Sequence, residues 1–393
     1  MKLDSFCVKG SEDKVTTKPH VLPIYATSSF VFDNIDQGIR IFSGEEEGHK
    51  YSRYGNPTID AVSEKIAKMA VYGSHEKVKA YMTSSGMSAI HIALTSMVCA
   101  GDAILSQGNL YGGSTELLKT ILSRSNVETI FTDLRDLNKV EEALAKHPNI
   151  KLCYFETPSN PGLTVVNIEQ LTALCKKRGI ITVADNTFCT PYIQQPLLMG
   201  TDIVIHSTTK YLSGHGNSIA GAIVCKENFA QVIWNTLKLT GSTCNAWDAW
   251  LTEQGIKTLA LRMDRHSSNA LELSRHLEKH QLIAKVNYPG LASHPDHATA
   301  KKQMNNFGGM ISFEIKGDLQ TGISFMNKLK LCTLAPTLGD VDTLILHPAS
   351  SSHLKVSKEL REENGISDTL IRMSIGIEKI DDIINDIEKA LEV

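Results

Sequence analysis

The stretch 180–186 reads Ile-Ile-Thr-Val-Ala-Asp-Asn, a short run that is apolar except for Thr182 and ends in two polar residues. Such a run is typical of a strand that is buried on both faces of a sheet. Similar runs occur at 78–83, 151–156 and 202–206, and amphipathic helical patterns lie between several of them. Short apolar strands that alternate with helices form βαβ units, so the sequence predicts an α/β fold with a mostly parallel sheet.

The pattern changes on either side of this region. After about residue 250 we expect one long helix or two over 251–282, strands at 309–315 and 370–377, and a closing helix at 379–391. We interpret residues 251–393 as a smaller C-terminal α+β domain and 51–250 as the larger domain. Residues 1–50 show little periodicity, which indicates an arm that packs on another subunit.

Composition excludes several classes of protein. The chain has 393 residues, 40 Lys and Arg against 43 Asp and Glu, and 42% hydrophobic residues. This balance argues against a strongly basic nucleic-acid binder and against a disordered chain. No apolar run approaches the ~20 residues of a membrane span, and the start lacks the apolar segment of a secretory signal. Eight cysteines without a C-x-x-C pair indicate no metal site and a reducing, cytoplasmic setting.

Residues that could bind a ligand through a side chain or a backbone N–H follow the predicted strands of the larger domain. In open α/β sheets, ligands bind at the carboxyl ends of the strands, so we expect these residues to meet in one crevice. They are Ser85, Gly86 and Met87 after 78–83, Tyr111 after 103–106, Asn160 after 151–156, Asp185 after 180–184, and Ser207, Thr209 and Lys210 after 202–206.

Asp185 and Lys210 are the most informative pair. Taken singly, an Asp at a strand end is usually a cap and a Lys after a strand is usually solvated. Together they suit one chemistry, because a lysine of lowered pKa forms a Schiff base with a carbonyl and a carboxylate keeps a pyridine nitrogen protonated. Backbone N–H groups at Gly86 and Met87, where a helix begins, would bind a phosphate. This combination points to pyridoxal 5′-phosphate.

Three further features suit the same site. Tyr111 could stack on a cofactor ring, although a half-buried loop tyrosine is the ordinary explanation. Arg53 lies in the turn-rich segment 51–57. Arg372 lies inside the apolar strand 370–377 and needs an anionic partner, which is either a substrate carboxylate or a structural Asp or Glu.

With these residues assembled, the chain resembles the transsulfuration family of pyridoxal-phosphate enzymes in Cys/Met metabolism, from about Pro23 to Leu391. The motifs that carry the resemblance are Y-S-R-Y-G-N-P-T at 51–58, S-S-G-M-S-A-I at 84–90, L-Y-G-G at 110–113, E-T-P-S-N-P at 156–161, V-A-D-N-T-F at 183–188 and H-S-T-T-K-Y at 206–211.

The resemblance implies the fold of aspartate aminotransferase, which is fold type I among pyridoxal-phosphate enzymes, and makes 51–250 the cofactor-binding domain. Lys210 would be the Schiff-base lysine and proton shuttle, and Asp185 would pair with the pyridine nitrogen. Tyr111 would stack on the ring and act as acid or base. The remaining implied contacts are Gly86, Met87, Ser207 and Thr209 to the phosphate, Asn160 to the 3′-oxygen, and Arg372 to the substrate α-carboxylate, with Thr337 and Tyr51 also at the substrate.

The resemblance also implies an assembly. Tyr51 and Arg53 would reach the phosphate of a neighbouring subunit's cofactor, so that two subunits share each active site. The expected form is a homotetramer, built as a dimer of dimers.

Only a few positions in the sequence indicate which reaction of the family this chain catalyses. The chemistry implied is γ-replacement or γ-elimination on a homoserine-derived amino acid. Methionine γ-lyases commonly carry Cys where this chain has Gly113, and cystathionine-handling members tend to have acidic residues where it has Lys50 and Pro336. The stretches 188–197 and 293–297 resemble O-acylhomoserine sulfhydrylases of the succinyl type, whereas 241–251 resembles cystathionine γ-synthases. We favour O-acylhomoserine sulfhydrylase, with methionine γ-lyase or cystathionine γ-synthase or lyase as the alternative.

Three other classes stay open at this point. One is a catalytically silent homologue, against which the joint presence of Lys210, Asp185 and Arg372 argues. Another is an aminotransferase on the same scaffold. The third is a metal enzyme using His276 and His280, whose i, i+4 spacing suits a helical metal pair but whose charged surroundings indicate a solvated helix face.

Overall fold

The computed structural model describes residues 17–352, 354, 358–363 and 365–392. The first sixteen residues of the predicted arm, with Cys7, lie outside the described residues.

The larger sheet has seven strands in the order β1-β7-β6-β5-β4-β2-β3. β7 runs antiparallel to both of its neighbours, and the other six strands point the same way. The carboxyl ends of β1, β4, β5 and β6 therefore lie along one edge, as the sequence predicts. The strands are β1 (Val78–Thr83), β2 (Ala103–Ser106), β3 (Glu128–Phe131), β4 (Ile150–Glu156), β5 (Ile181–Asp185), β6 (Ile203–His206) and β7 (Gly221–Lys226).

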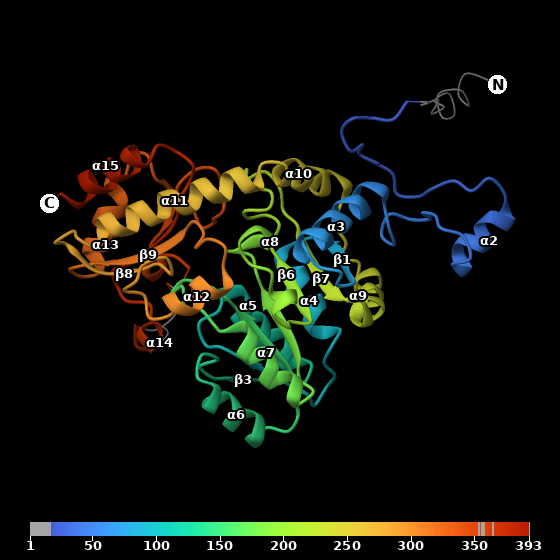
Figure 1. The fold of residues 1–393 in the computed structure, drawn as a ribbon, viewed down its shortest axis with the longest axis horizontal. Coiled ribbons are helices and arrows are strands. Elements are labelled where there is room, and N and C mark those ends of the chain that lie inside the picture. The colour runs from blue at the N-terminus through green and yellow to red at the C-terminus, as the bar shows by residue number, and fades with distance from the viewer. Residues whose placement is uncertain (1–16, 353, 355–357, 364, 393) are drawn as a thin grey trace.

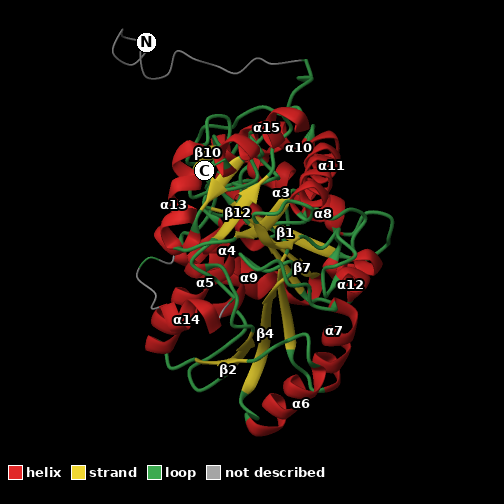
Figure 2. Ribbon diagram, turned by 90° about the vertical axis from the view of Figure 1, so that its left-hand side faces the viewer, coloured by secondary structure: helices red, strands yellow, loops and turns green. Residues whose placement is uncertain are grey.

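Helices cover both faces of this sheet (Figures 1 and 2). Successive strand residues point to opposite faces, so that Cys153 and Phe155 join one core while Leu152 and Tyr154 join the other. The first core includes α3 (Pro57–Ala70), α6 (Leu137–Lys146), α7 (Ile168–Lys177), α8 (Thr190–Ile193) and α10 (Ala246–Ile256). The second includes α4 (Gly86–Thr95), the π-helix η1 (Leu117–Leu122) that continues α5 (Gly112–Glu116), and α9 (Glu227–Thr240).

The second sheet is antiparallel except for one pair and has the order β10-β11-β12-β9-β8. Its strands are β8 (Ile283–Asn287), β9 (Met310–Ile315), β10 (Thr333–Leu334), β11 (Leu344–Leu346) and β12 (Leu370–Ser374). It packs against α11 (Leu259–Leu277), α13 (Leu319–Lys328) and α15 (Ile380–Leu391). Outside the arm, the other elements of the described ranges are α12 (His297–Gln303), α14 (Lys358–Glu363), η2 (Pro196–Met199) and η3 (Pro348–Ser350). The division of the chain at residues 50 and 250 stays a prediction.

The described part of the arm is anchored to the larger domain at one end. Thr58 at the start of α3 accepts the Tyr25 N–H at 2.9 Å, and Trp250 Nε1 donates to the Leu22 carbonyl at 3.0 Å. α2 (Ile35–Ser43) then stands clear of the body in Figure 1, with the side chains of Ile35 and Phe42 exposed. None of the helices in the described ranges is long and apolar enough to span a membrane.

Candidate active site

A cavity of about 250 Å³ lies where the carboxyl ends of the strands meet the second sheet. It brings together the predicted residues Gly86, Met87, Tyr111, Asn160, Asp185, Ser207, Thr209, Lys210, Thr337 and Arg372, which come from elements on both sides of residue 250. Glu156, at the end of β4, also lines it. The polar residues after the strands therefore do converge, as the parallel topology requires.

Lys210 follows β6 in a tight turn, where its N–H donates to the Ser207 carbonyl at 3.1 Å. The Lys210 ammonium donates to Thr337 Oγ1 at 2.8 Å. Burial, with a smaller contribution from the nearby Arg372 guanidinium, lowers the Lys210 pKa to about 8. About a tenth of this amine is then neutral at pH 7, and the neutral form is the one that can attack a carbonyl group.

Asp185 ends β5, and its Oδ1 accepts the Thr187 N–H at 2.9 Å. Burial raises the pKa of this carboxyl, and within the described chain no cation offsets that effect. A protonated ring nitrogen would supply the missing positive charge. The site thus fits a pyridine ring on this side of the cavity.

The end of the cavity near α4 suits a phosphate. The helix begins at Gly86, and Ser85 caps it by accepting the Ser88 N–H at 3.1 Å. A Cβ at Gly86 would lie 2.6 Å from Ser207 Cβ, so only glycine leaves room here. The free N–H groups of the first helical turn and the Ser207 hydroxyl can bind an anion. The Thr209 hydroxyl instead bonds to the Ala220 backbone, donating to its carbonyl at 3.1 Å.

Arg372 reaches the cavity from β12. The residue is 6% exposed, with one terminal guanidinium nitrogen 3.0 Å from the Thr337 carbonyl and the other 3.4 Å from Asn160 Oδ1. Burial lowers its pKa to about 10, which leaves it a cation at neutral pH. No described Asp or Glu forms an ion pair with it, and its Nε has no hydrogen-bond partner. Of the two partners that the sequence left open, a substrate carboxylate fits this geometry better.

Tyr111 lies at the mouth of the cavity with half of its surface exposed. Its backbone N–H donates to both carboxyl oxygens of Glu156, at 2.9 and 3.0 Å. Glu156 was not among the site residues predicted from the sequence. A signal was present, because Glu156 opens the motif at 156–161 and comes directly after a buried strand.

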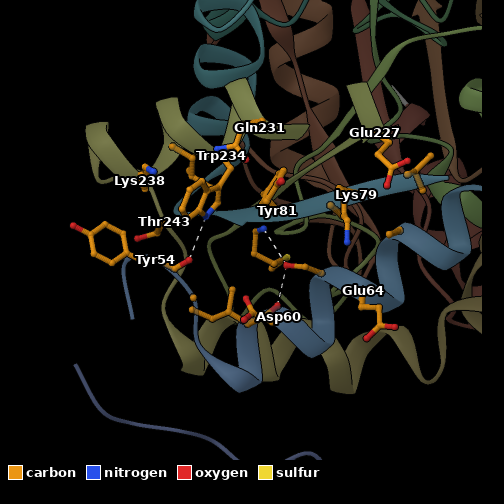
Figure 3. Close-up of a pocket in the computed structure, with 18 of the residues that line it drawn as sticks. Tyr54, Asp60, Glu64, Lys79, Tyr81, Glu227, Gln231, Trp234, Lys238 and Thr243 are labelled. Carbon is orange, nitrogen blue, oxygen red and sulfur yellow. Dashed lines mark hydrogen bonds between the residues drawn. The ribbon is translucent and has the colours of Figure 1, made fainter. Parts of the chain in front are cut away.

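Tyr51 and Arg53 do not line the Lys210 cavity of their own chain. Arg53 instead lies in a larger cavity of about 830 Å³ between α3, β1 and α9. Figure 3 shows this cavity with Trp234, Lys238 and Tyr81 on one side and Asp60 and Glu64 on the other. The predicted contact of Tyr51 and Arg53 with a neighbouring subunit stays a prediction.

The predicted alternative of a metal site has no support in the described ranges. His276 Nε2 lies 2.6 Å from Glu388 Oε1, and His280 Nε2 lies 3.5 Å from the other oxygen of the same carboxylate. No group of three His, Cys, Asp or Glu residues in the described chain could hold a metal ion.

Comparison with known proteins decides the family. A model of the Cys/Met metabolism PLP-dependent enzymes matches residues 4–392. The chain belongs to this family.

Relatives within the family cover nearly the whole chain. An L-methionine gamma-lyase of Fusobacterium nucleatum is 45% identical over 374 residues, which are 94% of this chain and 93% of the relative. A cystathionine beta-lyase of Lactococcus lactis is 42% identical and covers 97% of this chain and 96% of its own length. The crystal structure of a cystathionine gamma synthase from Xanthomonas oryzae superposes with a TM-score of 0.88 at 37% identity, covering 94% of this chain and 92% of that one.

This chain is therefore a pyridoxal-phosphate-dependent transsulfuration enzyme of fold type I, as the resemblance implied. The lyase names among its relatives support the lyase alternative better than the O-acylhomoserine sulfhydrylase that the sequence analysis favoured.

Proposed function

We propose that this enzyme is a C–S lyase that acts on methionine or a closely similar thioether. Methionine and one water would give methanethiol, 2-oxobutanoate and ammonia. The observation that carries the proposal is the lining of the cavity. Its acidic and basic side chains are Glu156, Asp185, Lys210 and Arg372. Neutral polar residues such as Asn160, Ser207 and Thr337 also line it, and most of the remaining surface is apolar, with Met87, Ile90, Phe188, Ile219 and Leu338. Such a surface suits an S-alkyl group better than a second amino-acid head. Relatives named L-methionine gamma-lyase add support.

A second candidate is β-elimination from cystathionine, which with one water would release homocysteine, pyruvate and ammonia. A cavity of about 480 Å³ shares Thr209, Ile219, Thr337 and Leu338 with the Lys210 cavity and adds Asp248 and Asp340. Its acidic residues could accept the distal ammonium group of the larger substrate. Relatives named cystathionine beta-lyase favour this candidate.

The residues of the cavity would hold the cofactor at four points. The first turn of α4, with Gly86, and the Ser207 hydroxyl would bind the phosphate, Asp185 the ring nitrogen, Asn160 the ring oxygen and Lys210 the aldehyde carbon. Pyridoxal phosphate, when bound, supplies an aldehyde that condenses with amines and a ring that accepts the electron pair of the α-carbon.

Different side chains of the cavity would then act on different parts of the substrate. Arg372 binds the α-carboxylate with two parallel hydrogen bonds and so orients the α-carbon. The Lys210 amine, which Thr337 holds by its 2.8 Å hydrogen bond, takes the α-proton and moves the β-proton that γ-elimination also requires. The Tyr111 phenol gives a proton to the departing sulfur, which leaves as a thiol.

We also propose that the active form is a homotetramer built from dimers that share active sites. The exposed apolar side chains of α2, Ile35, Ile39 and Phe42, support a partner for the arm. Tyr51, which is exposed and does not line the Lys210 cavity of its own chain, is available to a second chain. The seven described cysteines are free thiols, which supports a cytoplasmic setting.

One assay separates the candidates. The holoenzyme is incubated with methionine alone, with cystathionine alone, and with O-succinylhomoserine plus sulfide, and the products are identified. We expect methanethiol and 2-oxobutanoate from methionine, and none from a Lys210→Ala control. Pyruvate and homocysteine from cystathionine, with no turnover of methionine, would replace the proposal with the second candidate. Homocysteine formed only from O-succinylhomoserine and sulfide would contradict both.

A further inference from the structure

Glu156 is a buried carboxyl group that the proposed chemistry does not use. Its residue is 5% exposed, and it lies at the end of β4 directly beside Asp185 in the register of the sheet. In the part of the chain that the structure describes, no Lys, Arg or His compensates its charge. A buried carboxyl without a cation is costly unless hydrogen bonds satisfy it, so its partners indicate what it does.

Those partners lie mostly in one segment, the turn that begins α5. The Tyr111 N–H donates to Oε1 at 2.9 Å and to Oε2 at 3.0 Å, and the Ser114 hydroxyl donates to Oε1 at 3.2 Å. Outside this segment, the Asn160 backbone N–H also donates to the carboxyl, and Tyr154 contributes one longer contact, with its hydroxyl 3.5 Å from Oε1. Through these hydrogen bonds, Glu156 anchors the segment that carries Tyr111 to the end of β4 in the sheet.

In the described chain, few other contacts fix the position of the segment that carries Tyr111. The Tyr111 phenol is half exposed, so packing alone does not fix it. No side-chain cap closes the start of α5. A group that transfers a proton must stay within hydrogen-bond reach of the reacting atom, and a misplacement of about 1 Å is enough to slow the reaction strongly.

We propose that Glu156 is a positioning residue, which fixes the Tyr111 phenol at the mouth of the cofactor cavity by anchoring the Tyr111 backbone. This inference rests on the proposed function, because it concerns the phenol that protonates the leaving sulfur.

The charge state of Glu156 suits that role. Burial and, secondly, the charge of Asp185 raise the Glu156 pKa to about 8, so that the neutral acid predominates at pH 7. A neutral carboxyl still offers a carbonyl oxygen to the Tyr111 N–H. Glutamine offers the same acceptor in nearly the same shape, whereas alanine removes it.

A double-mutant cycle tests the proposal in the holoenzyme. The variants are E156A, E156Q, Y111F and E156A/Y111F, with S114A as a matched control that removes one donor to Oε1 and leaves the Tyr111 anchor. We expect E156A to lower kcat/KM by roughly 10- to 100-fold, because a misplaced catalytic group slows the reaction by about that much. E156Q should restore most of the lost kcat/KM, and S114A should lower kcat/KM less than E156A does. Because Glu156 acts through the phenol, E156A should have little further effect in the Y111F background. Equal effects of E156A in both backgrounds would overturn the proposal.

A second measurement needs no turnover. Hydrogen–deuterium exchange of the apoenzyme reports on the peptide that contains Tyr111 and Ser114. We expect this peptide to exchange faster in E156A than in wild type or E156Q, while exchange in the rest of the chain stays unchanged. An unchanged rate in E156A would show that Glu156 does not anchor the segment. If wild type turned over none of the sulfur amino acids, the proposed function would fail, and the exchange result would still decide whether Glu156 holds Tyr111.

Discussion

The lowered pKa of Lys210 gives a prediction that pH can test. Burial is the larger cause and the Arg372 guanidinium the smaller, and together they lower the Lys210 pKa from 10.5 to about 8. The amine loses its proton at a lower pH than an ordinary lysine, so its reactive neutral form is already present at pH 7. From these two pKa values, the neutral fraction at pH 7 is about 10% for Lys210 and about 0.03% for an ordinary lysine, an enrichment of roughly 300-fold.

The assay is the rate at which the full-length apoenzyme captures pyridoxal 5′-phosphate, followed by absorbance from pH 6 to pH 11. We expect the rate to rise through a midpoint near 8 and then level off. N-acetyl-lysine amide in the same buffers is the control for the cofactor's own titration, and its midpoint should lie near 10.4. Arg372→Gln removes the positive charge that makes the smaller contribution to the lowered Lys210 pKa, so the midpoint pH of cofactor capture should move upward. A wild-type midpoint that coincides with the control would refute the argument from burial.

Three further predictions concern cofactor and substrate binding. Asp185→Asn should keep the cofactor but lower kcat by about 100-fold or more, since the ring nitrogen loses its charge partner, as absorbance and steady-state kinetics would show. Gly86→Ala places a Cβ 2.6 Å from Ser207 Cβ and should weaken cofactor binding about tenfold or more, whereas Gly162→Ala, with its nearest neighbour at 4.0 Å, should not. Arg372→Lys should raise the KM for methionine by roughly 10-fold or more with a smaller change in kcat, because an ammonium cannot form two parallel bonds to a carboxylate. An unchanged KM in that variant would remove Arg372 from the substrate site.

Much of the sheet could be predicted from the sequence. Strand 78–83 matches β1, and 202–206 and 151–156 match β6 and β4 to within a residue at each end. These strands are short apolar runs bounded by polar residues, and the parallel topology then places their carboxyl ends together. β7 (Gly221–Lys226) was not predicted, and its antiparallel direction could not be, because an apolar run carries no information on the direction of a strand.

Two buried polar residues, one near the site and one in it, show why such contacts escaped prediction. Arg262 on α11 reads as part of a polar helix face, yet it is buried and donates to the carbonyls of Tyr211 and Gly255, at 2.8 and 2.7 Å. Glu156 reads as the start of a polar loop, yet it is buried under Tyr111. Each acts through a contact with a residue at least seven positions away, which periodicity does not encode. The contact predicted for Tyr51 and Arg53 would involve a second chain, and the pattern of one chain does not locate it.

The central claim is that the cofactor is attached to the amine of Lys210. The most direct measurement is to reduce the holoenzyme with borohydride, which fixes the cofactor to the amine that holds it, and then to locate the added mass by peptide sequencing. The account predicts a pyridoxyl group on Lys210 and none in the Lys210→Ala variant. A pyridoxyl group on another lysine of the wild type, or none at all, would contradict it.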